Sequence, residues 1–189
     1  TAPAALLGRH HPDIVVLVAG AIPPIGPLQE QTWESFSANW DVDVKIAFHW
    51  LREILLAPLR PGSRVIVVSS GAAIGGSPLS GGYAGAKATQ RFIAQYAQEE
   101  ARRAGLGITF STVLPRFAPG TGVGEPAIRA YAERAGVAVP EYLETFRRSF
   151  GPLVSADAAG DAIAGLAAEA AAAIAPAYLL TGAGLQKLG

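Results

Sequence analysis

The sequence contains no cysteine, which excludes disulfide bonds, thiolate metal sites and a cysteine nucleophile. It also carries no net charge, because 15 lysine and arginine residues balance 15 aspartate and glutamate residues. A chain without net charge has no long-range field to attract nucleic acid or an anionic membrane, so neither is an expected partner. The lack of cysteine fits a reducing compartment, and we expect a cytoplasmic protein.

Long apolar runs are missing as well. The apolar stretches at residues 14–18 and 65–68 are far shorter than the roughly 18 to 20 residues that a membrane helix needs. The alanine-rich stretch 156–175 contains three acidic residues and is expected to form a helix outside any membrane. The first eight residues lack the charge and the apolar core of a secretory signal, so export is not expected.

The 189 residues, half of them apolar, suit one domain over residues 1–189. Continuous β-branched runs predict strands at 14–18, 64–68, 108–114 and 178–181, and the first of them looks buried on both faces. Apolar spacing of three and four residues predicts helices at 31–56, 83–104 and 156–175. This alternation of strands and helices predicts an α/β fold, a doubly wound parallel sheet with helices on both faces.

Residues 116–150 interrupt this alternation after the third predicted strand. They combine glycine and proline with short helical pieces, so we expect an insertion that covers a site. Gly120, Gly122 and Gly124 would serve as hinges rather than as a phosphate loop, because no strand precedes them and no Lys-Ser or Lys-Thr follows. Aromatic anchors for a substrate are expected within it at Tyr131, Tyr142, Phe146 and Phe150.

Small or polar residues follow the strands at Gly20, Ser70 and Pro115, and such strand ends line one crevice in an open α/β sheet. Tyr83 and Lys87 lie four residues apart on a predicted helix, so their side chains share a face. An ammonium group close to a phenol favours the phenolate and lowers the tyrosine pKa from its ordinary value of about 10. The pair would then act as a proton donor or acceptor for a carbonyl group.

A tyrosine followed four residues later by a lysine also occurs by accident on solvated helix faces. Two neighbouring features favour a site: Ser70 lies thirteen residues before Tyr83 at a strand end, and a glycine-rich stretch connects them. The whole segment 65–88, VIVVSSGAAIGGSPLSGGYAGAKA, resembles the catalytic segment of the classical short-chain dehydrogenase/reductase family. The resemblance extends over nearly the whole chain, from DIVVLVAG at 13–20 to YLLTGAG at 178–184.

The resemblance implies a Rossmann-like fold, an NAD or NADP cofactor and a small-molecule carbonyl or alcohol substrate. It also implies that Ser70 holds the substrate oxygen and that Tyr83 transfers the proton. Lys87 would bind the nicotinamide ribose and lower the pKa of Tyr83. The positions that match the family's cofactor-binding residues are Ala19, Gly20, Tyr83, Lys87, Pro115 and Thr121.

Three residues depart from the family's pattern. Asp43, 27 residues before Ser70, stands where the family has an asparagine that helps to hold a water, and its charge would oppose a phenolate. Val18 replaces an asparagine of the family's strand-end motif, and Arg116 replaces a glycine after Pro115. We therefore keep two hypotheses: an oxidoreductase, and a non-catalytic cofactor-binding or scaffold relative.

No strand with a glycine-rich turn precedes Asp13, although the family binds the cofactor pyrophosphate at such a turn. We expect that this chain is the C-terminal part of a longer protein, lacking the first βα units; the alternative is an altered short form. The segment alone would then bind cofactor poorly, and residues 14–18 would lie at a sheet edge.

Family members commonly pair their two long helices, so the resemblance implies a homodimer or homotetramer through residues 31–56 and 83–104. Trp50, Phe92 and Tyr96 are candidate contacts. No metal site is indicated, because His10 and His11 have no acidic or sulfur ligand near them in the sequence.

Overall fold

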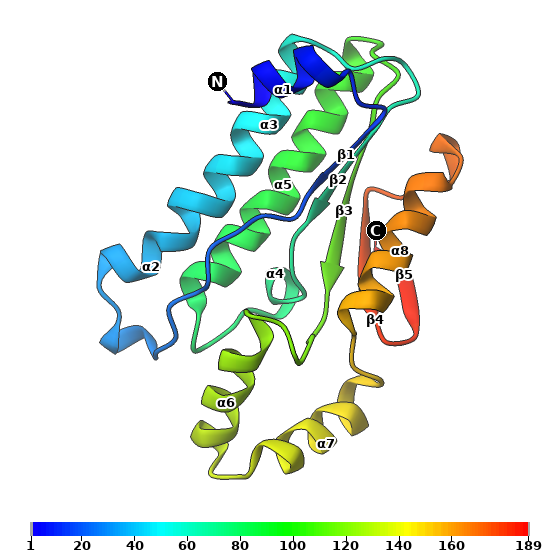
Figure 1. Cartoon of the computed structure of the whole chain (residues 1–189). Helices are drawn as coiled ribbons and strands as arrows, with labels where there is room; N and C mark the ends of the chain where they lie inside the picture. Colours follow the sequence, from blue (N-terminus) through cyan, green and yellow to red (C-terminus); the bar gives the residue numbers. More distant parts are fainter. Residues whose placement is uncertain (1, 189) are drawn as a thin grey trace.

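In the computed structural model, which describes residues 2–188, the chain folds around one five-stranded sheet in the order β1-β2-β3-β4-β5. Strands β1 (Ile14–Leu17), β2 (Arg64–Val68), β3 (Thr109–Pro115) and β4 (Ala177–Thr181) are parallel, and β5 (Gly184–Leu188) runs antiparallel to β4. Figure 1 shows helices packed along this sheet. The predicted α/β architecture is confirmed, whereas β5 was not predicted.

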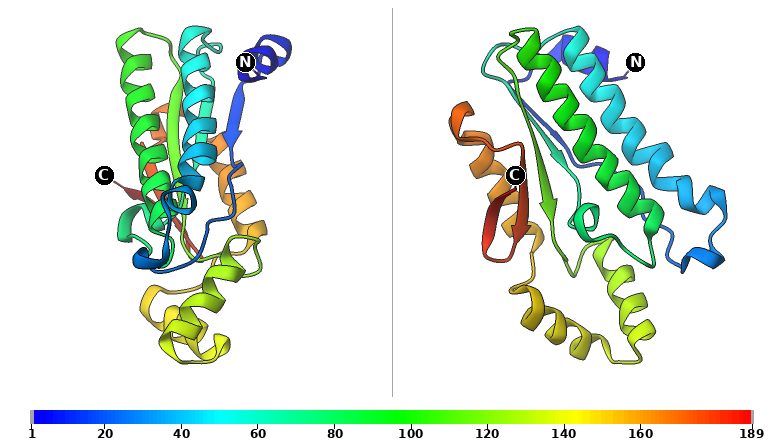
Figure 2. Two further views of the ribbon diagram at one scale, coloured as in Figure 1. Left: turned by 90° about the vertical axis from the view of Figure 1, so that its left-hand side faces the viewer. Right: turned by 180° about the vertical axis from the view of Figure 1, so that it is seen from behind.

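One face of the sheet packs against a long helical stretch and against α5 (Gly81–Arg103), as the side view in Figure 2 shows. The stretch consists of α2 (Trp33–Asn39), a π-helical turn η2 (Trp40–Val44) and α3 (Lys45–Leu56). The core on this face joins Leu51 and Ile54 of α3 to Val65 and Val67 of β2. Ile66 points the other way, toward α8 (Ala156–Ala168), because successive strand residues alternate between faces.

Strand β1 lies at an edge of the sheet, as expected, but it is not buried on both faces. Val15 and Leu17 are buried, whereas Ile14 and Val16 keep 43% and 38% of their surface exposed. The continuous apolar run does not indicate which residues are exposed, because burial of an edge strand depends on its neighbours rather than on its own sequence. The strand also ends at Leu17, so Val18 lies outside it.

The predicted helix at 31–56 begins at Trp33, with Thr32 as its N-cap: the Thr32 side chain accepts a hydrogen bond from the Ser35 backbone N–H. Its π-helical turn was not predicted, because one extra residue per turn changes the apolar spacing too little to be noticed. Helix α5 begins two residues before Tyr83, and β3 is shifted by one residue from the predicted 108–114.

The alanine-rich helix is shorter than predicted. It ends at Ala168, with Glu169 in an extended conformation, and only a 3₁₀ turn at Ala171–Ala173 follows it. Leu166 and Ala167 are the last residues of this helix that pack against the core. Helix propensity alone did not extend α8 beyond them, because helices in proteins are stabilised mainly by packing.

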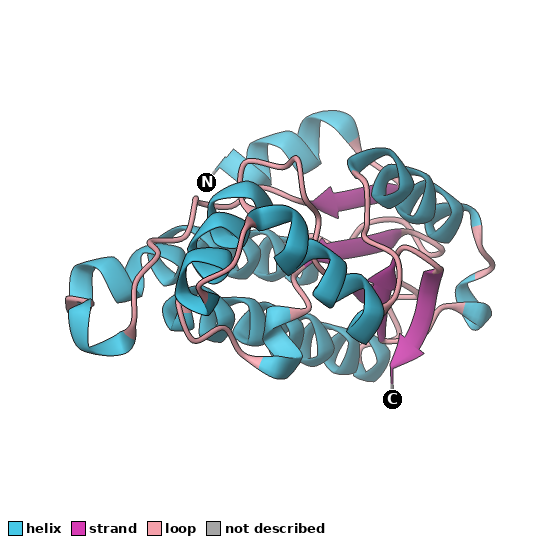
Figure 3. Ribbon diagram, turned by 90° about the horizontal axis from the view of Figure 1, so that it is seen from below, coloured by secondary structure: helices cyan, strands magenta, loops and turns pink. Residues whose placement is uncertain are grey.

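The segment 116–150 forms α6 (Gly124–Ala135) and α7 (Val139–Phe150). Both lie beyond the ends toward which the strand arrows of Figure 1 point, and Figure 3 shows them from below. The remaining short elements are α1 (Ala2–His10), which was not predicted, η1 (Leu28–Glu30) and α4 (Ala72–Gly75). None of the helices within residues 2–188 has the length and apolarity to cross a membrane.

Candidate functional site

A cavity of about 750 Å³ opens where the carboxyl ends of the parallel strands meet α6 and α7. Ligands bind at this edge in open α/β sheets. Most of the predicted site residues line it: Gly20, Asp43, Ser70, Tyr83, Lys87, Pro115 and Thr121. Ala19 does not line it and is exposed.

Ser70 follows β2 after one residue, and Tyr83 lies in the first turn of α5. The Ser70 hydroxyl accepts a hydrogen bond from the Ala72 backbone N–H at 3.2 Å. It also lies close enough to the Tyr83 hydroxyl to lower the pKa of that phenol. Gly82, next to Tyr83, packs so closely on α2 that an added Cβ would overlap the Phe36 carbonyl oxygen. This packing fixes the start of α5, and therefore Tyr83, against the neighbouring helix.

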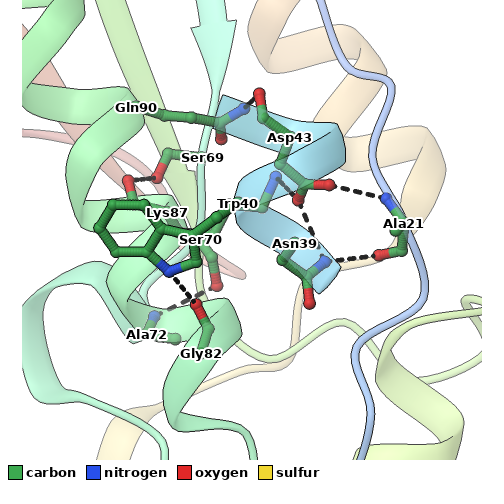
Figure 4. Close-up of polar contacts among 10 residues, drawn as sticks. All are labelled: Ala21, Asn39, Trp40, Asp43, Ser69, Ser70, Ala72, Gly82, Lys87 and Gln90. Atoms are coloured by element: carbon green, nitrogen blue, oxygen red, sulfur yellow. Dashed lines mark hydrogen bonds and ion pairs between the residues drawn. The ribbon is translucent and has the colours of Figure 1, made fainter. Parts of the chain in front are cut away.

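The second group of polar residues centres on Asp43, in the π-helical turn (Figure 4). The Lys87 Nζ lies 3.2 Å from Asp43 Oδ2, and both side chains are almost fully buried. The Ala21 backbone N–H donates to Asp43 Oδ1 at 2.7 Å, and the Gln90 side-chain amide donates to the Asp43 backbone carbonyl at 2.9 Å. Asp43 thus connects the loop after β1, the π-helical turn and α5.

Gly20 supports this arrangement in a way that the sequence did not indicate. A Cβ at this position would lie 2.9 Å from Asp43 Oδ2, so only glycine allows the carboxylate to approach the loop so closely. Asn39, also missed from the sequence, donates to the Ala21 carbonyl at 3.0 Å and to Asp43 Oδ2 at 3.4 Å. Its position four residues before Asp43, on the same side of a helix, was an available signal.

The resemblance implies that Lys87 lowers the pKa of Tyr83, whereas the overall shift of this pKa in the structure is upward. Burial raises the pKa of Tyr83 above its ordinary value, the hydrogen bond from Ser70 opposes this rise, and the charge of Asp43 adds to it. The Lys87 Nζ lies 5.5 Å from the centre of the Tyr83 ring, but its charge is balanced by the Asp43 carboxylate. Burial and the nearby Asp43 carboxylate thus both disfavour the phenolate form of Tyr83.

Thr121 lines the cavity, but its hydroxyl is engaged locally. It donates to the Ala118 carbonyl and accepts from the Gly124 backbone N–H, both at 2.9 Å, and so closes the turn that leads into α6. Tyr131 of α6 was predicted only as an aromatic anchor, and its polar contacts were missed. Its hydroxyl is hydrogen-bonded to the Ser77 hydroxyl at 2.7 Å and accepts from the Leu79 backbone N–H at 3.1 Å. This contact joins α6 to the loop before α5, and no sequence signal pointed to it.

No protein-family model and no curated protein sequence matches the chain. It does match solved structures. A sorbitol-6-phosphate 2-dehydrogenase from Erwinia amylovora superimposes with a TM-score of 0.80 at 18% identity, over 95% of this chain and 73% of that one. An angucycline C-6 ketoreductase with bound NADP gives 0.67 at 28% identity, over 92% and 63%. An NAD+-bound xylitol dehydrogenase gives 0.74 at 16% identity, over 96% and 72%.

These solved structures are short-chain dehydrogenases and reductases, and so is a protein from Francisella tularensis that also matches. The resemblance seen in the sequence is therefore confirmed, and the fold is that of this family. This chain spans between 63% and 73% of the lengths of the three structures above.

Proposed function

We propose that this chain forms the catalytic part of an NAD(P)-dependent oxidoreductase that reduces a carbonyl group or oxidises a secondary alcohol, with Tyr83 as the acid or base. The observation that carries the proposal is that Ser70 and Tyr83 line one cavity, close enough for the Ser70 hydroxyl to lower the pKa of Tyr83, with Lys87 one helical turn beyond Tyr83. A phenol and a hydroxyl that face the same cavity can both reach one substrate oxygen.

The residues present fit the nicotinamide half of the cofactor. An ammonium group has three donor protons, and Asp43 accepts one from Lys87, which leaves donors for the two ribose hydroxyls. The cavity volume of about 750 Å³ is in the usual range for a small-molecule site. Gly20 and Pro115 would contribute backbone contacts, and Thr121 would contribute its backbone because its hydroxyl is engaged. When bound, the nicotinamide would supply or accept the hydride.

The protein side chains would handle the proton. Ser70 would hold the substrate oxygen beside the Tyr83 hydroxyl, which donates its proton to that oxygen during reduction. The raised pKa of Tyr83 keeps the phenol protonated at neutral pH, which suits reduction, whereas oxidation of an alcohol requires the phenolate. We therefore propose that reduction is favoured near neutral pH and that oxidation increases as the pH rises toward the pKa of Tyr83.

Substitution Tyr83→Phe tests this function. We expect it to lower kcat/KM for reduction of a carbonyl panel with NADPH or NADH by at least about 100-fold, because the proton donor is lost. Tyr178→Phe is the matched control, since Tyr178 is a buried tyrosine whose hydroxyl accepts a backbone hydrogen bond outside the cavity. Turnover that survives in Tyr83→Phe would exclude Tyr83 as the acid.

A second candidate is a non-catalytic relative that binds the cofactor. It is favoured by one observation: Asp43 neutralises Lys87 and opposes formation of a Tyr83 phenolate. The same carbonyl panel separates the two candidates, because cofactor binding in a calorimeter without turnover of any compound would support the non-catalytic one.

We also propose that residues 116–150 are a cover over the substrate. Gly120 and Gly136, which flank α6, have positive φ angles of 78° and 68°, so the backbone at both ends of α6 adopts conformations that glycine permits. The Tyr131 hydroxyl contacts with Ser77 and Leu79 join α6 to the rim of the cavity.

Hydrogen exchange followed by mass spectrometry tests the cover. We expect amides of α6 and α7 to exchange faster than those of α5 in the free protein, and to slow when NADPH and a carbonyl substrate are both added. Exchange equal to that of α5, and unchanged by these ligands, would show a permanently packed subdomain instead.

The outer face of α5 supports the proposed pairing of two or four copies. Phe92 and Tyr96 lie four residues apart and expose 52% and 58% of their surface, and Phe48 of α3 exposes 51%. Trp50 is half-buried against the core and offers less surface to a partner.

Light scattering at micromolar concentration tests this pairing. We expect the mass of a dimer or tetramer for the parent chain and of a monomer for Phe92→Glu, because a buried unpaired charge disfavours an apolar interface. A monomeric parent chain would contradict the pairing.

A further inference from the structure

We propose that the cavity selects a carbonyl compound whose flat apolar body carries an anionic group, and that Arg116 binds this anion. This inference rests on the proposed function and adds the substrate class to it. Arg116 stands where the family usually has a glycine, so the resemblance does not explain its side chain.

The position of Arg116 places its side chain close to the reacting groups. Its backbone N–H donates to the Leu180 carbonyl at 2.8 Å, which fixes the residue directly after β3. A Cβ built on Gly71, the residue after Ser70, would lie 3.7 Å from Arg116 Cγ, so the Arg116 side chain runs alongside the Ser70 segment. Its guanidinium carbon lies 4.9 Å from the centre of the Phe150 ring.

The charge balance of the cavity leaves Arg116 as the cation without a counterion. The charged side chains that line the cavity are Asp43, Lys87 and Arg116. Asp43 and Lys87 form an ion pair with each other, whereas no carboxylate within residues 2–188 forms one with Arg116. A guanidinium beside apolar surfaces is suited to a carboxylate or phosphate, which it can bind through two parallel hydrogen bonds.

The body of the ligand is indicated by a row of aromatic rings that ends at Arg116. Tyr131 and Tyr142 stack with 6.4 Å between their ring centres and 9° between their planes. Phe117 lies 6.3 Å from Tyr142 and stacks on Phe146 at 4.7 Å. Phe146 then lies 4.7 Å from Phe150, the ring that Arg116 covers.

These rings come from α6, from α7 and from the residue after Arg116, and all of them line the cavity. Flat rings prefer to pack on other rings in offset or edge-to-face contact. An extended apolar ligand along the row would present one end to Arg116. Because Ser70 and Tyr83 line the same cavity beside Arg116, a carbonyl group and an anion on one ring system can be bound together.

Calorimetry with two matched probes tests this substrate class. We expect 6-acetyl-2-naphthoate to bind at least about tenfold more tightly than 2-acetonaphthone, which has the same ring system and carbonyl but no carboxylate. Arg116→Gln should remove this difference, and Arg116→Lys should keep part of it, because lysine retains the charge without the planar pair of donors. Arg148→Gln, an exposed change of equal charge on α7, should leave the difference intact.

Two results would overturn the proposal. The first is equal affinity of the parent chain for the two probes, a result that does not depend on any variant folding well. The second is a preference for the carboxylate that persists in Arg116→Gln. If this second result comes with loss of pyrophosphate or NADPH binding in Arg116→Gln, Arg116 is assigned to the cofactor phosphates. Turnover of neutral carbonyls tests the proposed oxidoreductase separately, so the two can fail independently.

Discussion

The buried ion pair between Asp43 and Lys87 is the interaction on which the candidate site depends. The two side chains keep 1% and 7% of their exposure, and the removal of each ion from water costs several kcal/mol. The attraction between the two charges and the hydrogen bonds from Ala21 and Asn39 to the same carboxylate offset this cost. The carboxylate therefore holds together three segments that are distant in the sequence, and loss of one partner would leave an unpaired buried charge.

This ion pair leaves the cavity with one balanced cation and one unbalanced cation. The charge of Lys87 is balanced, and burial together with Asp43 raises the pKa of Tyr83, so the phenol is a proton donor. Arg116, alongside the Ser70 segment and the ring of Phe150, carries a charge that no carboxylate within the described residues balances. Neutral reacting groups with a positive side chain beside them suit a carbonyl compound that also carries an anionic group.

The parts of this structure that depend on local sequence could be predicted. The spacing of Ser70, Tyr83 and Lys87 placed them on a strand end and on one helix face, and the structure brings all three to one cavity. The sign of the pKa shift at Tyr83 could not be predicted, because it depends first on how deeply the fold buries Tyr83 and then on where the π-helical turn directs Asp43. The one-sided burial of β1 depends in the same way on neighbouring elements.

A titration of Tyr83 tests the central claim that burial and the charge of Asp43 raise the pKa of this phenol. The measurement is tyrosine Cζ nuclear magnetic resonance against pH, with the Tyr83 signal assigned by its absence in Tyr83→Phe. Asp41→Asn is the control, because Asp41 is an exposed carboxylate two residues from Asp43. We expect the pKa of Tyr83 to exceed the ordinary tyrosine value of about 10 in the parent chain and to fall in Asp43→Asn. A parent pKa below the ordinary value, or one that Asp43→Asn leaves unchanged, would contradict the claim.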